Sequence, residues 1–452
     1  MKEQKDAPQD RGYFVGIVFF ILGLGTLLPW NFFMTASSYF QATLNTTEWI
    51  NGTLVGGKDY HYVNWMTLLS QLPLLLFTLL NSILYQRISE RIRIAGSLIL
   101  VLLLFMFTAV LVKVPMEKDK FFSVTMATIW FINSFGAVLQ GSLFGLVGLL
   151  PLKYSAIFMS GQGLAGTFAA IAMLVAIGSE AAPETAAMGY FITPCVGTLV
   201  TLISYLLLPR LAFAQYYFNK TNKYEAGTTD ELLKESSMVE NGKLNGHGGL
   251  AESERDPGTD ETKRAFVSLE SEKEQTKSSV LEVFKKIWLM AFCVTFVFTV
   301  TLSVFPAVTA DVKTIFSKNW ERFFITVSCF LTFNINDWIG RSITSFVQWP
   351  RKDSPVFVVL VVSRVIFIPL LMLCNVQPRS HLPVFFYHDA IFTVIMTVFS
   401  LSSGYFACLS MSYAPQLVEP KDAETAGALM TFFLALGLSL GAGLSFPLRA
   451  LV

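Results

Sequence analysis

The chain has 452 residues, of which 53% are hydrophobic and 14% are charged, and phenylalanine alone occurs 41 times. A soluble domain carries about 25% charged residues, so this composition excludes a disordered chain, a fibrous chain and an ordinary soluble enzyme. A net charge of +1 excludes a global field that recruits nucleic acid, and five scattered cysteines indicate neither a disulfide framework nor a metal site.

The hydrophobic residues gather into runs long enough to cross a bilayer as helices, which takes about 20 residues. We therefore predict an all-α, polytopic membrane protein whose first span is too long and too polar at its end for a cleaved signal peptide. The eleven predicted spans cover residues 12–36, 63–85, 92–114, 121–150, 156–178, 187–208, 284–308, 323–348, 355–375, 385–412 and 424–450.

Residues 211–281 interrupt this pattern and are rich in Glu, Lys, Ser, Gly and Asn. Such a segment cannot bury a core and is typical of a disordered linker. The predicted organisation is an N-terminal tail (1–11), a six-helix bundle (12–210), the linker (211–281) and a five-helix bundle (282–452). Two helical bundles around a midplane cavity are the architecture of many secondary transporters, and no ATP-binding loop motif is present.

The orientation prediction rests on glycosylation sequons in the first loop, at Asn45 and Asn51. Two sequons in one short loop place that loop outside and favour the plasma membrane. The basic residues divide between both sides, and a third sequon at Asn219 falls on the inner side. We predict a cytosolic N-terminus, a cytosolic linker and, from the odd number of spans, an extracellular C-terminus.

Polar residues within the apolar runs are few, because a charge at mid-membrane costs at least about 2.5–3.5 kcal/mol. In span eight, Asn334, Asp337 and Arg341 stand at i, i+3 and i+7 on one helix face. One interpretation is an internal ion pair that holds the bundle together. The other is a cavity-facing pair that binds vicinal hydroxyls, since a carboxylate accepts and a guanidinium donates hydrogen bonds.

Span four carries Gln140 near Gly136, and span two carries Gln71. A buried amide matches the edge of a nucleobase, but spacing alone favours helix-packing contacts for both glutamines. In span one, Trp30 is more typical of an interface anchor than of a stacking platform. The neighbouring Pro29 predicts a locally broken helix, and Phe305-Pro306 predicts a similar break at the end of span seven.

Several stretches together resemble the equilibrative nucleoside transporter family (solute carrier 29), in order and over nearly the whole membrane portion. The short run Gln71-Leu72-Pro73 is most similar to the second-type vertebrate paralogue. The matching stretches are Gly23-Leu24-Gly25-Thr26-Leu27-Leu28-Pro29-Trp30-Asn31, Asn133-Ser134-Phe135-Gly136-Ala137-Val138-Leu139-Gln140-Gly141-Ser142, Ser160-Gly161-Gln162-Gly163-Leu164-Ala165-Gly166, Asp337-Trp338-Ile339-Gly340-Arg341-Ser342 and Glu424-Thr425-Ala426-Gly427-Ala428.

The resemblance implies a six-plus-five, major-facilitator-like fold, passive bidirectional movement of nucleosides, movement of nucleobases by second-type members, and no cofactor. It places the base contacts at Leu27, Trp30, Gln71, Gln140 and Leu438, and the ribose contacts at Asp337 and Arg341. It places an inhibitor pocket at Gly136, an outer gate at Met34, Phe305 and Pro306, and an inner gate at Arg93, Asn334 and Glu424. Ser403 departs from the family, whose members carry Asn there.

Three functional hypotheses follow. The first is ion-independent transport of nucleosides by alternating access, with nucleosides and membrane lipid as partners and no obligate protein partner. The second is proton-coupled transport with Asp337 as the proton carrier, which the neighbouring Arg341 disfavours. The third is a channel or receptor, although the chain has no acidic ring or carbonyl-filter motif. An enzyme is not expected, since no Ser/His/Asp or Cys/His cluster is present.

Overall fold

The computed structural model describes residues 8–44, 48–50, 53–55, 60, 62–84, 87–178, 183–219 and 278–452. The described part is nearly all helical, with one small hairpin. The elements that precede the linker are η1 (Arg11–Tyr13), α1 (Phe14–Thr35), α2 (Ser37–Leu44), β1 (Glu48–Ile50), β2 (Thr53–Val55), α3 (Tyr62–Leu84), η2 (Ile92–Gly96), α4 (Ser97–Leu111), α5 (Lys118–Gly148), α6 (Leu152–Gly178), α7 (Pro183–Leu207) and η3 (Leu208–Arg210).

After the linker the chain is again helical, and it ends with the long helix α16. The elements there are α10 (Val280–Val304), η4 (Thr309–Asp311), α11 (Lys318–Phe324), η5 (Ile325–Leu331), α12 (Thr332–Ile343), α13 (Pro355–Ser363), η6 (Arg364–Ile366), α14 (Phe367–Met372), α15 (Asp389–Tyr413), η7 (Ala414–Leu417), η8 (Pro420–Asp422) and α16 (Ala423–Leu451).

Within the described residues, ten helical stretches are long and apolar enough to cross a membrane. They coincide with ten of the predicted spans. The predicted span 323–348 falls on α11, η5 and α12, which follow one another without a break from Lys318 to Ile343. This run is not among the ten stretches, and it carries Asp337 and Arg341.

The predicted break at Pro29 is wrong, because α1 continues through the proline to Thr35. Asn31 Nδ2 donates to the Leu27 carbonyl oxygen at 2.8 Å, and this side-chain bond adds a contact within the proline-containing turn. The break at Phe305-Pro306 is confirmed. Helix α10 ends at Val304, and Phe305 adopts an extended backbone conformation.

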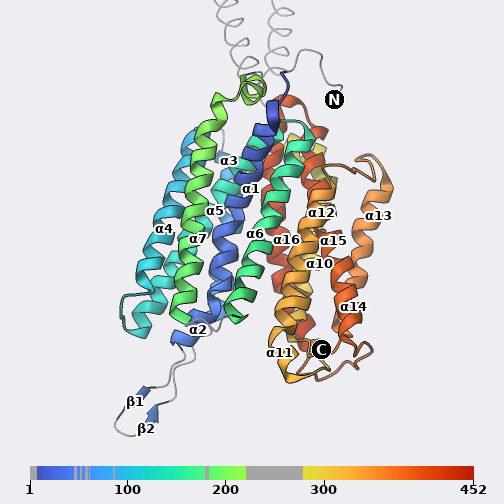
Figure 1. Cartoon of the computed structure of the whole chain (residues 1–452). Coiled ribbons are helices and arrows are strands. Elements are labelled where there is room, and N and C mark those ends of the chain that lie inside the picture. The colour runs from blue at the N-terminus through green and yellow to red at the C-terminus, as the bar shows by residue number, and fades with distance from the viewer. Residues whose placement is uncertain are drawn as a thin grey trace, which may run out of the picture.

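Figure 1 shows two side-by-side helical bundles, one built from α1 and α3–α7 and the other from α10–α16. Within the first, α1 packs on α6 and α7, and α3 packs on α5. Between the bundles, α16 packs on α3 and α5, and α12 packs on α6. The chain enters and leaves the linker at the end where the described part begins, whereas the C-terminus lies at the opposite end. We call these the linker end and the far end.

The hydrophobic core is shared by both bundles at one end only. The largest cluster joins residues near the linker end of both bundles, such as Phe19, Phe158, Val294 and Met430. At the far end each bundle has a separate hydrophobic cluster. The cluster of the first bundle lies around Phe33 and Phe40, and that of the second lies around Phe324. The two bundles therefore share one hydrophobic core at the linker end, whereas each bundle has its own core at the far end.

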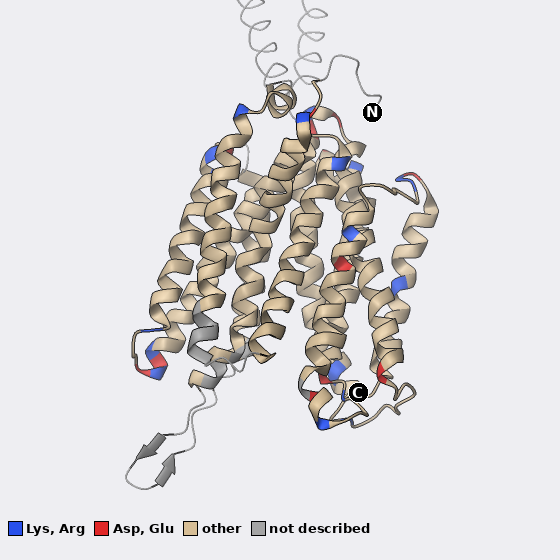
Figure 2. Ribbon diagram, viewed as in Figure 1, with Lys and Arg blue, Asp and Glu red and all other residues tan. Residues whose placement is uncertain are grey.

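Charged residues gather at both ends of the bundles, and few lie between them (Figure 2). Many large apolar side chains on the outer helix faces are exposed, as expected of a surface that contacts lipid. A short antiparallel hairpin, which the sequence analysis did not predict, pairs Trp49 with Leu54. The sequons at Asn45 and Asn51 lie outside the described residues, and Asn219 is an exposed helical residue.

Candidate substrate site and gates

The centre of the second bundle holds a buried ion pair on α12. Arg341 Nε donates to Asp337 Oδ2 at 2.7 Å, and each residue is 7% exposed. Within the described residues, Asp337 Oδ1 and Arg341 Nη2 take part in no hydrogen bond. Separating two charges from water is costly unless their remaining hydrogen-bonding groups are satisfied. The pair therefore presents a free acceptor and a free donor side by side.

Gln162 connects this pair to the first bundle, and the sequence analysis did not identify it as a site residue. Arg341 Nη1 donates to Gln162 Oε1 at 3.4 Å, and Gln162 Nε2 donates to Thr26 Oγ1 at 3.1 Å. One amide thus links α12 to α6 and α1. The signal was present in the run Gly161-Gln162-Gly163, which lies in one of the stretches that resemble the family.

Glycines allow α6 to approach α12 closely beside the ion pair. A Cβ on Gly163 would lie 2.9 Å from Trp338 Cα, and a Cβ on Gly166 would lie 2.0 Å from Asn334 Oδ1. Ser160 Oγ and Ser342 Oγ are 2.7 Å apart in the same interface. The small residues of α6 are therefore required by helix packing against α12.

Two of the predicted base contacts carry polar groups that lack partners. Gln71 Oε1 on α3 is buried without a hydrogen-bond partner, and Gln140 on α5 is buried and forms no hydrogen bond with any other described residue. Buried polar atoms are nearly always paired, so Gln71 Oε1 calls for an explanation. A ligand or water between the bundles would supply the missing partners.

The remaining predicted contacts are half-buried side chains. Leu27 and Trp30 lie on α1 and Leu438 lies on α16. The Trp30 ring stacks in parallel on Phe33, with ring centroids 6.5 Å apart. A Cβ built on Gly136 of α5 meets nothing within 4 Å, so there is open space beside it. These positions are distributed over α1, α5 and α16, and both α1 and α16 contact α5.

At the linker end, two residues of the predicted inner gate, Arg93 and Glu424, form an ion pair. Arg93 Nη2 donates to Glu424 Oε1 at 3.3 Å, which joins η2 to α16. Arg93 also donates to Ser142 Oγ at 3.1 Å and to the Ile88 carbonyl oxygen at 3.1 Å. The third predicted member, Asn334, lies elsewhere. Its amide donates to the Phe330 carbonyl oxygen at 2.9 Å, and its side chain contacts Gly166.

The predicted outer-gate residues lie apart. Met34 on α1 is 37% exposed. Phe305 stacks on Phe333 at 3.9 Å between ring centroids and meets Phe330 edge-on, so its contacts lie within its own bundle. Together with the separate far-end cores, this arrangement resembles a carrier that is closed at the linker end and open at the far end.

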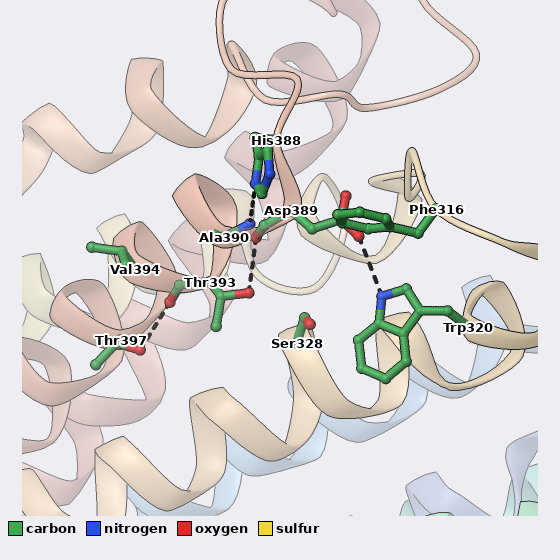
Figure 3. A pocket seen from close by; sticks show the side chains of 9 residues that line it. All are labelled: Phe316, Trp320, Ser328, His388, Asp389, Ala390, Thr393, Val394 and Thr397. Carbon is green, nitrogen blue, oxygen red and sulfur yellow. Dashed lines mark hydrogen bonds between the residues drawn. The ribbon is translucent and has the colours of Figure 1, made fainter.

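A hollow of about 700 Å³ lies at the far end of the second bundle, and it contains none of the predicted binding residues. Asp389 at its wall accepts a hydrogen bond from Trp320 Nε1 at 3.3 Å (Figure 3) and another from Ile315 N at 3.2 Å. These bonds join the loop before α11 and α11 itself to the start of α15. The lining residues are Phe316, Trp320, Ser328, His388, Asp389, Ala390, Thr393, Val394 and Thr397.

Two helical bundles, with a buried ion pair on α12 beside α6 and a contact between the bundles at one end, have the fold of the major-facilitator type. The solved structure of the proton:xylose symporter XylE, a major facilitator, shares this fold with a TM-score of 0.57 at 11% identity. The alignment covers 97% of this chain and 89% of that chain.

Sequence comparison then identifies the family. The model described as "Nucleoside transporter" matches residues 126–450. The chain is 52% identical to equilibrative nucleoside transporter 2 of Rattus norvegicus over 99% of both chains. It is 52% identical to the Homo sapiens protein of that name over 99% of both chains. It is 47% identical to human equilibrative nucleoside transporter 1, over 98% of this chain and 99% of that one.

The chain therefore belongs to the equilibrative nucleoside transporter family and is most like its second type. It is a multi-pass membrane transporter and not an enzyme, and the channel and receptor hypotheses gain no support.

Proposed function

We propose that this protein carries nucleosides across the plasma membrane by facilitated, bidirectional, ion-independent alternating access, and that it also accepts nucleobases. The observation that carries the proposal is the buried Asp337–Arg341 pair, which leaves one acceptor and one donor free. These groups match a ribose diol, since each hydroxyl both donates and accepts hydrogen bonds.

The base then lies toward the first bundle. Gln71, whose Oε1 has no partner, and Gln140 carry amides that can donate and accept hydrogen bonds at the edge of a base, and the Trp30 indole offers a flat face. Leu27 and Leu438 supply apolar contacts around them. Because an unpaired buried polar group costs about 1–3 kcal/mol, a substrate without these groups is disfavoured.

The described state is the outward-facing one in this scheme. We place the N-terminus and the linker in the cytosol and the C-terminus outside, supported by the opposite ends at which they lie (Figure 1) and by the sequons at Asn45 and Asn51. The bundles, 12–210 and 282–452, rock so that Arg93 and Glu424 separate while Met34, Phe305 and Pro306 close the outside.

Uptake of radiolabelled uridine by proteoliposomes tests the proposal. We expect saturation, counterflow and no response to an imposed acid-outside gradient. Asp337→Ala and Arg341→Ala should raise the uridine KM by about tenfold or more, because each removes a charge-assisted hydrogen bond of about 1.5–3 kcal/mol. Asn336→Ala, a change on the same helix outside the stripe, should leave the KM unchanged.

Full uridine affinity in both Asp337→Ala and Arg341→Ala would refute the ribose assignment. Uptake that is driven by the acid-outside gradient would instead make Asp337 a proton carrier. A parallel competition series with free nucleobases tests the nucleobase part, since bases lack the sugar and should not respond to the Asp337 substitution.

A further inference from the structure

Arg364 is a buried cation in the predicted ninth span, where the sequence analysis found only an apolar run. It lies in η6 and is 2% exposed. An ionisable residue at such a position is costly and marks a functional region by default. The candidate transport site described above does not use it directly.

The guanidinium of Arg364 ties three segments together. On α10 it donates to the Val297 carbonyl oxygen at 3.0 Å and to Thr301 Oγ1 at 3.1 Å. On α15 it donates to Ser402 Oγ at 3.1 Å and to the Phe399 carbonyl oxygen at 3.3 Å. All four acceptors are uncharged. The Arg364 side chain links α10 to α15 and so fixes their relative position.

Ser403, the position at which the chain departs from the family, contacts the residues that bind Arg364. Ser403 is buried, and its Oγ lies 3.0 Å from Thr301 Oγ1, the same atom that accepts from Arg364. The next residue, Gly404, touches α12. A Cβ there would lie 2.1 Å from the Asp337 carbonyl oxygen.

The backbone of α15 therefore packs directly against the backbone of α12 at Asp337. Gly340 repeats the contact from the other side, since its Cβ would lie 2.3 Å from the Leu401 carbonyl oxygen. With no side chain between the two helices, a displacement of α15 moves Asp337 with it.

We propose that Arg364 is a positioning residue for sugar recognition. By joining η6, α10 and α15, it sets the place of the Asp337 carboxylate at which ribose hydroxyls bind. This inference rests on the proposed function, in which Asp337 and Arg341 contact the ribose. It predicts that Arg364 governs the discrimination of hydroxylated from deoxygenated sugars while leaving recognition of the base unchanged.

The test is competition by uridine and by 2′,3′-dideoxyuridine against radiolabelled uridine uptake in proteoliposomes. The wild-type protein should prefer uridine. In Arg364→Gln the inhibition constant for uridine should rise by about tenfold, as for loss of one hydrogen bond to a charged group, while that for the dideoxy compound stays within about twofold. Arg364→Lys, which keeps the charge but not the forked geometry, should restore part of the preference.

Ser402→Ala removes one hydrogen-bond acceptor of Arg364 and should lower the preference for uridine by a smaller factor. If Arg364→Gln fails to fold, Ser402→Ala tests the proposal in its place. Ser363→Ala, an exposed neighbour that bonds only the Leu360 carbonyl oxygen, is the matched control. If the wild type does not prefer uridine, the ribose assignment itself fails. The other outcome is that the wild type prefers uridine and the variants keep the full ratio of inhibition constants between uridine and the dideoxy compound. If Ser402→Ala and those Arg364 variants that fold all behave in this way, Arg364 is a scaffold residue and the inference is wrong.

Discussion

Removing the Glu424 carboxylate should shift the conformational equilibrium of the carrier toward its inward-facing state. The Arg93–Glu424 pair joins the two bundles at the linker end, with a nitrogen–oxygen distance of 3.3 Å and side chains that are 5% and 16% exposed. In the proposed scheme, the pair forms only while that end is closed. A substitution that abolishes it therefore raises the energy of the described state relative to the inward-facing one.

The magnitude follows from the burial and the partners of the pair. Hydrogen bonds to charged groups contribute about 1.5–3 kcal/mol, and the remaining Arg93 bonds to Ser142 and Ile88 limit the loss. Because 1.4 kcal/mol is about tenfold in an equilibrium constant, Glu424→Ala should shift the population about 10- to 100-fold. Arg93→Ala should do the same, and the two changes together should add little to either alone.

Accessibility of position 34 reports the shift. Met34 is 37% exposed at the far end, so Met34→Cys should react with a membrane-impermeant maleimide added outside. The background carries Cys195→Ser, because Cys195 is half-buried while the other four cysteines are buried. The labelling rate tracks the outward-facing fraction, and it should fall in Glu424→Ala to the extent that the inward-facing state becomes the major one.

A neighbouring surface pair provides the control. Lys421 Nζ lies 3.1 Å from Glu419 Oε2, but the Glu419 side chain is 60% exposed. Exposed pairs contribute about 0–1 kcal/mol, so Glu419→Ala should change the labelling rate by less than about threefold. An unchanged rate in both Glu424→Ala and Arg93→Ala would show that this pair does not hold the linker end closed.

Three further predictions follow. Gly166→Ala places a methyl group against Asn334 and should abolish uptake by forcing α6 from α12, whereas Gly178→Ala, in open space on the same helix, should not. Burial raises the pKa of Glu90. The folded state is therefore more stable while Glu90 is protonated, and this stabilisation is lost as pH rises through that pKa. Glu90→Gln should raise the melting temperature at neutral pH, and the gain should vanish in acid. Asp389→Ala leaves Ile315 N and Trp320 Nε1 without their acceptor and should lower the melting temperature and alter tryptophan fluorescence.

The helices and the ion pair could be predicted from the sequence because each depends on local spacing. A run of about 20 apolar residues has few alternatives to a membrane-spanning helix. Asp337 and Arg341 are one turn apart, so their contact follows from the helix itself. The Arg93–Glu424 contact spans 331 residues of chain, and family resemblance rather than spacing predicted it.

The polar contacts between helices could not be predicted in the same way. Gln162 bridges Thr26 and Arg341 because α6 lies between α1 and α12, which no spacing rule reveals. Arg364 was missed for a different reason. It is surrounded by apolar neighbours in sequence, and its partners are main-chain and hydroxyl oxygens of helices that follow or precede it by 35 residues or more.

The contacts between the bundles differ in kind along the molecule, and this difference favours a particular pivot. At the linker end, Gly427 and Gly145 let the helices of the two bundles approach closely. In the centre, Trp338 Nε1 donates to Ser160 Oγ at 3.2 Å and Arg341 donates to Gln162. We infer that α6 and α12 stay in contact as the bundles rock. A sugar held at Asp337 would then lie beside the axis, where the site moves least while the two ends open in turn.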